Sequence, residues 1–463
     1  MKRRDAIRII PLSIVGISEM ARYAVSESNP LPSFSSEPLS MQYVSKVIDM
    51  LTWIRENQTE NLLEAAYAIA RTVENGGQCW ESGWDAGHTQ ADLWPGRNGM
   101  PEIFKTGYDK DAAKDGDLLI TGSSTGNEEF IKHLAERDIL LISHPSPWSG
   151  DAKKSELVRD DIRSLSLKNH ADIWIETNNS TLGGVINLPG MPAPIGPVSA
   201  VIGKVTIWMM IADACRILAR RGIVLPVDGD EPPIADKVDW RSFSGWVHLH
   251  NPLMDDYFDE VIKQIKMIRS ELGNLRKIGA MAVETVLEGG TVYGYSRYTS
   301  IAGEANTRRA GLALTRGIYG RNGGSFEGTS KDCVIMGITK TDDEIDLQYL
   351  DQFKKSGMKI ASIGPMTRNI RVPEGRAVHK ESDVHAGRMC DTYGLFAIPG
   401  YKQKICPTSG VLINQMYWAA VMEFAEQFIE QTGNVPAVYY SAALKGGMEH
   451  YFRMQEVSKE QGY

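Results

Sequence analysis

Long hydrophobic runs are missing from this sequence of 463 residues. No stretch approaches the roughly 18 consecutive apolar residues that a transmembrane helix requires, so the sequence predicts no transmembrane helix and no membrane partner. An excess of positive charge is missing too, because 50 Lys and Arg residues stand against 58 Asp and Glu residues and give a formal net charge of −8. Since nucleic-acid binding depends on a basic surface, nucleic acid is not an expected partner.

Cysteine is scarce and scattered along the chain. The five cysteines are odd in number and none lies in a C-x-x-C pair, which argues against a disulfide framework or a zinc site. We expect them to be small residues of the core. His248 and His250 lie close in sequence with no third ligand in view, so the sequence predicts no metal site, and nothing in it calls for a cofactor.

The N-terminus carries a pair of arginines before a modestly apolar stretch. The order of Arg3, Arg4 and the apolar residues that follow resembles a twin-arginine export signal. We therefore expect residues 1–26 to be a signal for export to the periplasm, followed by a linker over residues 27–40 that is rich in Ser and Pro. The usual aromatic residue after the arginine pair is missing, so an amphipathic arm on a cytoplasmic protein is the alternative.

The chain is organised around residues 115–145. Two short apolar runs, residues 118–120 and 139–142, flank an amphipathic stretch over residues 127–137, which is the pattern of a βαβ unit in a parallel sheet. Three hydroxyl residues and a glycine, at 123–126, lie between the first strand and the helix. Backbone N–H groups at a helix N-terminus favour an anionic ligand, and parallel sheets bind ligands at the carboxyl ends of their strands. A plain helix cap is the alternative.

Further segments extend this pattern toward both ends of the chain. Apolar residues at spacings of three and four predict amphipathic helices over residues 41–73. A short strand over residues 78–80 leads into a glycine-bearing turn, residues 81–88. Residues 171–176 have the pattern of another strand, and residues 199–221 have the pattern of a buried helix.

The pattern then starts again in the second half of the chain. Four landmarks recur in the same order at nearly one offset, which indicates an internal duplication. The period is too long for a solenoid, so we expect a first domain over residues 41–235, a linker over 236–252, a second domain over 253–455 and a tail over 456–463. The matched landmarks are Tyr43 with Tyr257 (257 − 43 = 214), Gly76 with Gly289 (289 − 76 = 213), Asp117 with Asp332 (332 − 117 = 215) and Pro197 with Pro407 (407 − 197 = 210).

Taken together, these motifs resemble two SIS (sugar isomerase) phosphosugar-binding domains in tandem. The resemblance spans about residues 41–455 and depends on the order, spacing and duplication of short motifs. It implies an α/β fold of two SIS-like domains, each a five-stranded parallel sheet flanked by helices. It also implies a ligand of the phosphosugar class and aldose–ketose isomerisation. The motifs are Gly76-Gly77, Ser82-Gly83 with Gly87-His88, residues 116–126, 139–143 and 197–200, and the ends of the two halves at 229–231 and 446–450.

The resemblance assigns a phosphate-binding loop. Many SIS domains hold phosphate with the pattern Ser-x-Ser-Gly-x-Thr, whose last hydroxyl is replaced here by Glu128. A carboxylate close to a phosphate would repel it, so either Glu128 points outward along its helix or the ligand is an unphosphorylated sugar or sugar acid derivative. The expected substrate-binding residues are Ser82, Gly83, Ser123, Ser124, Thr125, Gly126 and Glu128.

Isomerisation at a sugar carbonyl needs a base that moves a proton between adjacent carbons and an acid that opens the ring. Glu and His are the usual groups, and a structural role is the alternative for each of them. A lysine would stabilise the charge of an enediolate-like intermediate. The candidate catalytic residues are Glu81 and His88 around the first turn, and Glu449, His450 and Lys445 near the C-terminus.

The loop of the second half that corresponds to the phosphate loop has a different chemistry. Residues 338–344 lack the glycine and carry three acidic residues, which oppose an anion although Lys340 is present. We therefore interpret the second site as degenerate. Tyr295 and Arg297, in the preceding turn, are expected either to reach the ligand of the first domain or to form the domain interface.

Two classes of function stay open on the sequence. The first is an enzyme, either an aldose–ketose type sugar or phosphosugar isomerase or a related etherase-like lyase acting on an amino-sugar acid. The second is a non-catalytic protein that binds or senses a carbohydrate derivative. Both take a small-molecule sugar or sugar phosphate as partner, without a cofactor. Because SIS domains commonly pair, the duplication would supply this pairing within one chain, and homodimerisation of the whole chain stays open.

Overall fold

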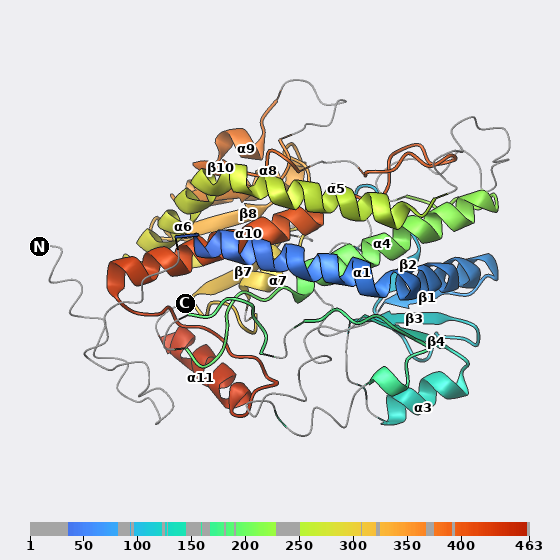
Figure 1. Cartoon of the computed structure of the whole chain (residues 1–463). Coiled ribbons are helices and arrows are strands. Elements are labelled where there is room, and N and C mark those ends of the chain that lie inside the picture. The colour runs from blue at the N-terminus through green and yellow to red at the C-terminus, as the bar shows by residue number, and fades with distance from the viewer. Residues whose placement is uncertain are drawn as a thin grey trace, which may run out of the picture.

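Two parallel β-sheets lie in the two halves of the molecule, and long helices run between them (Figure 1). Each sheet has five strands. The computed structural model describes residues 36–81, 93, 97–122, 126, 128–144, 159, 167–179, 182–188, 191–227, 251–306, 308–320, 325–366, 375–390 and 394–460.

The first sheet has the strand order β2-β1-β3-β4-β5, and all of its neighbouring strands are parallel. Its central strand is buried on both faces: Leu118 and Ile120 pack into the core between the halves, and Leu119 packs on the opposite face. This two-sided burial explains why the strand is a continuous apolar run. The strands are β1 (Cys79–Glu81), β2 (Phe104–Thr106), β3 (Leu118–Thr121), β4 (Leu140–Ser143) and β5 (Ile173–Trp174).

The second sheet repeats this order as β7-β6-β8-β9-β10, again with parallel neighbours. Its strands are β6 (Val292–Ser296), β7 (Thr315–Tyr319), β8 (Cys333–Gly337), β9 (Lys359–Ile363) and β10 (Val384–Ala386). The two five-stranded parallel sheets confirm the predicted α/β fold class. The equal strand order is what an internal duplication predicts, and the duplication itself stays a prediction.

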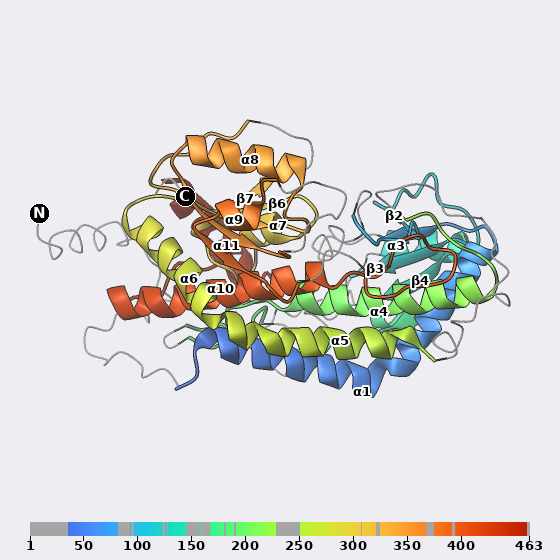
Figure 2. The same cartoon turned by 90° about the horizontal axis from the view of Figure 1, so that it is seen from above.

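Four long helices form a layer along one side of both sheets, and Figure 2 shows them from above. α4 and α10 extend from the middle of the molecule in opposite directions, and α1 and α5 lie beside them. α8 covers the outer face of the second sheet and α3 the outer face of the first. The helices are α1 (Leu39–Glu74), α3 (Glu128–Glu136), α4 (Ser199–Arg220), α5 (Leu253–Met267), α6 (Leu272–Leu287), α7 (Ile301–Ala305), α8 (Glu344–Lys355), α9 (Val378–Glu381), α10 (Ser409–Thr432) and α11 (Gly447–Glu460).

The halves exchange helix caps. Asp213, on α4 of the first half, accepts hydrogen bonds from the backbone N–H groups of Leu253 (3.2 Å) and Met254 (3.1 Å), where α5 begins. In the same way Glu426, on α10 of the second half, accepts the N–H of Leu39 (3.0 Å), where α1 begins. These partners satisfy backbone donors that a helix start leaves free. Each half therefore completes a helix of the other.

Two backbone bonds across the interface are also reciprocal. The N–H of Gly196 donates to the carbonyl of Ala310 (3.0 Å), and the N–H of Cys406 donates to the carbonyl of Gly99 (3.0 Å). The donors are 406 − 196 = 210 residues apart and the acceptors 310 − 99 = 211 residues apart. Matching contacts in both directions are the mark of an isologous interface, which here joins two halves of one chain.

The helix borders differ slightly from the predicted domain borders. α1 begins at Leu39, so the last two residues of the predicted linker already belong to a helix. α5 begins at Leu253, where the second domain is expected to start. α11 continues to Glu460 and takes up part of the predicted tail. The domain borders remain predictions, and residues 1–26 lie outside the described part of the chain.

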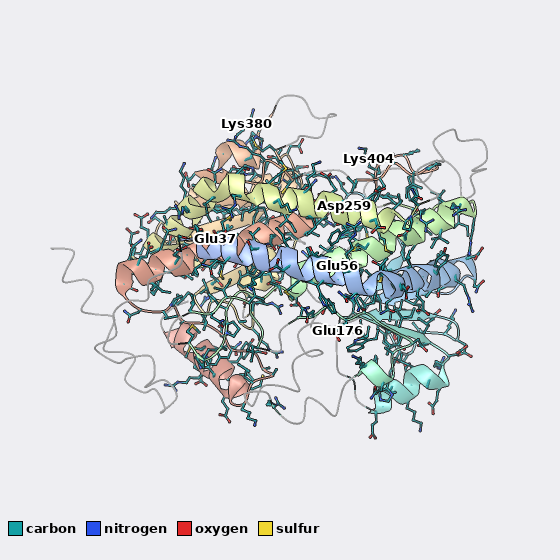
Figure 3. The ribbon with its side chains drawn as sticks, in the orientation of Figure 1. Glu37, Glu56, Glu176, Asp259, Lys380 and Lys404 are labelled. Atoms are coloured by element: carbon teal, nitrogen blue, oxygen red, sulfur yellow. The ribbon has the colours of Figure 1, made fainter. Side chains whose placement is uncertain are left out.

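α1 and α5 also meet through surface charges. Figure 3 shows Glu56 on α1 and Asp259 on α5, and Arg55, the neighbour of Glu56, pairs with Asp255 (3.2 Å) and Asp259. The five cysteines are all buried, which agrees with their predicted place in the core. Within the described residues, no helix is long and apolar enough to cross a membrane.

Candidate functional site

The strand order places a site at the carboxyl ends of β1 and β3. After β1 the chain moves to one side to form β2 and then returns to the other side to form β3. In parallel sheets with the order 2-1-3-4-5, ligands bind at the point where this direction reverses. β1 ends at Glu81 and β3 at Thr121, so these residues lie at that point in the first half.

Glu81 is the best placed of the predicted catalytic residues. It is the last residue of β1, its side chain is 0% exposed, and its backbone carbonyl accepts the N–H of Gly107 (3.0 Å). A carboxyl group fully removed from bulk water at a strand end is rare, because burial of a charge carries a large cost. The structure therefore brings one acid to the predicted edge, next to the loop that leaves β3.

That loop is only partly described. Gly126 lies against Leu167, and a Cβ atom on it would come within 2.6 Å of Leu167 Cδ2, so a larger residue would have to displace this contact. Glu128 begins α3 and is exposed. The exposed side chain fits the alternative that Glu128 points outward along its helix, where a negative residue in the first turn interacts favourably with the helix dipole. The other predicted residues here, Ser82, Gly83, His88, Ser123, Ser124 and Thr125, lie outside the described residues.

His144 is a residue of this edge that the sequence reasoning missed. It directly follows β4, its N–H donates to the carbonyl of Thr121 (3.0 Å), and its side chain is 3% exposed. Neither ring nitrogen has a hydrogen-bond partner among the described residues. Burial lowers the pKa of the imidazole from 6.5 to about 4, so the ring is neutral at pH 7. The sequence offered one signal for His144, because this histidine closely follows the apolar run at residues 139–142, which was predicted to be a strand of the same sheet.

Each long central helix begins beside an arginine of the other half. Arg308 donates to the Ser199 hydroxyl where α4 begins, and Arg97 donates to the Ser409 hydroxyl where α10 begins (3.3 Å). Arg308 also pairs with the buried carboxylate of Glu304 (3.3 Å). Residues 197–200 belong to the SIS-like motifs, so the second half contributes charged groups next to a predicted motif of the first.

The C-terminal candidates lie in a different setting. Lys445 and Glu449 are exposed. The His450 ring stacks on Tyr440 with a centroid distance of 3.7 Å, and its Nε2 atom lies 2.9 Å from the carbonyl oxygen of Val438. These contacts favour the structural alternative for His450. The segment just before it nevertheless reaches the first half, because the N–H of Arg159 donates to the carbonyl of Ala443 (2.8 Å).

The corresponding edge of the second half is filled by its own side chains. Asp343 caps α8 by accepting the N–H groups of Ile345 (3.0 Å) and Asp346 (3.2 Å), and Arg297 pairs with the same carboxylate at 2.6 Å. Tyr295 donates to Asp346 (2.7 Å). A carboxylate of the chain thus occupies the helix start that would otherwise attract an anion. Tyr295 and Arg297 bind partners in their own half, which contradicts the idea that they reach the first domain's ligand.

Asp346 is the most perturbed carboxyl of this second edge. Burial and the nearby Asp343 raise its pKa from 3.8 to about 8, against the opposite effects of Tyr295 and Arg297. The group is therefore largely protonated at neutral pH. Among the described residues, no group of three or more His, Cys, Asp or Glu side chains is arranged to hold a metal ion.

No protein-family model matches the chain. It is similar to a UPF0309 protein of Streptomyces griseus, with 23% identity over 224 residues that cover 42% of this chain and 88% of the relative. A UPF0309 protein of Streptomyces avermitilis is 21% identical over 258 residues, which cover 49% of this chain and 98% of the relative. Neither name states an activity.

Similar solved structures have low sequence identity. The C-terminal domain of a glucosamine-fructose-6-phosphate aminotransferase from Francisella tularensis has a TM-score of 0.42 at 12% identity and covers 85% of this chain and 98% of its own. A candidate tagatose-6-phosphate ketose/aldose isomerase from Clostridium novyi has a TM-score of 0.46 at 11% identity and covers 86% of this chain and 93% of its own. The two five-stranded parallel sheets are the architecture that the resemblance in the sequence implies. The activity has to come from the site.

Proposed function

We propose that the first half binds a sugar or sugar phosphate at the carboxyl ends of β1 and β3 and isomerises it between aldose and ketose forms. The observation that carries this proposal is the fully buried Glu81 at the end of β1, beside the strand whose following loop resembles a phosphate-binding loop. Isomerisation needs one base that takes a proton from one carbon and returns it to the next. Glu81 is the candidate for this base.

Two alternatives keep the same binding site. A non-catalytic binding or sensing protein would use the edge without moving a proton. An etherase-like lyase acting on an amino-sugar acid would take the same proton but expel a substituent. The exposed Glu128 leaves room for either a phosphorylated or an unphosphorylated ligand.

The decisive experiment uses Glu81→Gln with Glu129→Gln as its control, which removes an exposed carboxylate on α3 that is not among the expected site residues. Sugars and sugar phosphates are first screened by thermal shift, and the hits are then assayed for turnover. We expect Glu81→Gln to lose about 10²- to 10⁴-fold in turnover with binding retained, because general acid–base groups contribute factors of that size. Glu129→Gln should keep both turnover and binding.

The products distinguish the isomerase from the lyase and from the non-catalytic binding protein. Isomerisation leaves the mass of the substrate unchanged, whereas elimination splits it into two molecules. A hit that binds the wild type without any turnover identifies a binding or sensing protein. Full activity in Glu81→Gln would remove Glu81 as the base and with it the proposed mechanism.

We also propose that the chain is exported, on the basis of the arginine pair at residues 3 and 4. Periplasm and cytoplasm should be separated after expression of the wild type and of a variant with both arginines changed to lysine. Export of the wild type alone supports a twin-arginine-type signal. Equal amounts of both proteins in the cytoplasm would favour the amphipathic arm.

A further inference from the structure

Buried polar side chains from both halves meet where α4 and α10 begin. They come from α4, from the segment between β1 and β2, from the turn after β6 and from the start of α10. None of them is more than 4% exposed. We call the following residues the interhalf polar cluster: Arg97, Lys204, Thr299, Ser300, Thr408 and Asn414.

Lys204 is the centre of this cluster. Its ammonium group, which belongs to the first half, donates to the Ser300 hydroxyl (2.9 Å) and to the carbonyl of Gly410 (3.3 Å) in the second half. Ser300 in turn donates to Asn414 Oδ1 (2.9 Å). A lysine that is 0% exposed is unusual, and the ammonium group of this one contacts the other half.

Arg97 brings a second positive charge to the same region. Its guanidinium group donates to the carbonyl of Tyr298 (3.4 Å), in the turn after β6, and to the Ser409 hydroxyl (3.3 Å) at the start of α10. The two cations of the first half therefore contact the same two elements of the second half. Burial of like charges together is unfavourable unless negative charge is nearby.

Three polar atoms of the cluster have no hydrogen-bond partner among the described residues. They are Thr299 Oγ1, Thr408 Oγ1 and Asn414 Nδ2. Thr408 is the N-cap residue of α10, but its hydroxyl does not cap the helix. Thr299 Oγ1 lies at the carboxyl end of β8, since a Cβ atom on Gly337 would come within 2.7 Å of it. Buried polar atoms in native proteins are nearly always paired, so these atoms indicate a missing partner.

We propose that the interhalf polar cluster is a second binding site, which takes an oxyanion, namely a phosphate group. Ammonium, guanidinium, hydroxyl and amide N–H groups all donate hydrogen bonds, and a phosphate oxygen accepts them. In this half the start of α8 is already occupied by Asp343. Arg97 and Lys204 both contact the first residues of α10, so the proposed oxyanion lies there, between the halves. This site is distinct from the edge formed by Glu81 and does not depend on the function proposed for it.

The test is to count bound phosphate in the full chain. Equilibrium dialysis with radiolabelled inorganic phosphate at fixed ionic strength gives the number of sites per chain. The key variant is Lys204→Met, which keeps the length of the side chain and removes its charge. Lys380→Met is the matched control, because Lys380 is exposed on α9 (Figure 3). The double variant Ser123→Ala/Thr125→Ala removes the hydroxyls of the predicted phosphate loop in the first half.

We expect Lys204→Met to lose one phosphate per chain and Lys380→Met to lose none. Asn414→Leu, which removes an amide without changing the charge, should weaken this same site about tenfold, the effect of losing one good hydrogen bond. If Lys204→Met does not fold, as judged by circular dichroism, Asn414→Leu decides the question. Unchanged phosphate binding in the folded variant would overturn the proposal.

The same phosphate counts distinguish the proposed interhalf site from the site proposed in the first half. Loss of phosphate in Lys204→Met alone supports the interhalf site, and it contradicts a phosphate site in the first-half loop. Loss in the Ser123→Ala/Thr125→Ala variant alone overturns the interhalf site and leaves the proposed function intact. Glucose 6-phosphate, added as a competitor, shows whether the Lys204-dependent site takes free phosphate only or also a phosphorylated sugar.

Discussion

The carboxyl edges of the two sheets share a strand order and differ in what fills them. Cys79 pairs with Leu118, and Val292 pairs with Cys333, so Glu81 and Gly294 hold the same place in their sheets. Glu81 is a buried acid. At Gly294 a Cβ atom would lie 2.5 Å from the Cβ of Ala305, because α7 packs directly onto the strand.

The helices that follow the central strands show the same contrast. The residue before α8 is Asp343, which caps the helix and binds Arg297. The residue before α3 is Asn127, which carries no charge. In the second half a glycine and an aspartate therefore stand where the first half has Glu81 and Asn127, and both contact other residues of their own half. A repeated fold keeps its strands and changes its chemistry at strand ends and helix starts.

The largest expected effect concerns the helix starts that each half caps for the other. Asp213 and Arg216 form a buried ion pair with side chains 0% and 4% exposed, and Asp213 also holds the start of α5. We expect Asp213→Ala to lower the free energy of unfolding by about 3–5 kcal/mol, because it removes one member of a buried pair. Urea unfolding measures the change.

The matched variant is Glu426→Ala, which removes the corresponding cap of α1. Glu426 is 8% exposed and accepts one backbone N–H, so its loss should cost only about 1–2 kcal/mol. Equal effects of the two variants would mean that the ion pair with Arg216 adds nothing to the cap.

The stability that Asp346 contributes in the second half should depend on pH. Because the pKa of Asp346 is raised from 3.8 to about 8, its contribution to stability is present below pH 4 and is lost as the pH rises through 8. Asp346→Asn removes this titration and can still accept the Tyr295 hydroxyl. We expect the variant to exceed the wild type by on the order of a few kcal/mol in unfolding free energy at pH 8. Parallel slopes from pH 5 to pH 8 would contradict this account.

In the first half, His144 should make the stability depend on pH in the opposite direction, with a loss at low pH. Its pKa is lowered by burial to about 4, so the unfolded chain takes up a proton first and stability falls as the pH drops from 6.5 to 4. His144→Gln should remove on the order of 1–2 kcal/mol of this loss at pH 5. His385, in the second half, has a similarly lowered pKa but is only half-buried, so His385→Gln should have the smaller effect. Thermal unfolding at pH 5 and pH 7 compares the two variants, and a larger effect for His385→Gln would reverse the expected order.

The fold was predictable because its signals are local. β3 and β4 are short apolar runs on either side of an amphipathic helix, and two-sided burial explains why the runs are continuous. Glu81 could be predicted as an edge residue because it directly follows an apolar pair. The acids of the loop after β8 were also visible in the sequence, and one of them, Asp343, closes the helix start.

The remaining features depend on residues far apart in the chain. His144 belongs to no motif, and its burial follows from the packing around the end of β4. The bonds of Lys204 to Ser300 and of Arg97 to Ser409 join positions that differ by 96 and 312 residues. Periodicity reports which face of an element is buried, but not which residue of another element it meets. The contacts between the halves therefore appear only in the structure.

The reciprocal bonds between the halves have a consequence for how such a protein can change. In a symmetric dimer of identical chains, every substitution appears twice, once in each copy of the site. Here the two halves are encoded by different parts of one chain, so Asp343 can cap a helix at one edge while Glu81 lies at the other. The covalent link also keeps the partner surfaces at a high effective concentration, whatever the amount of protein. A chain with two such halves can therefore change one edge without losing the partner surface that packs against it.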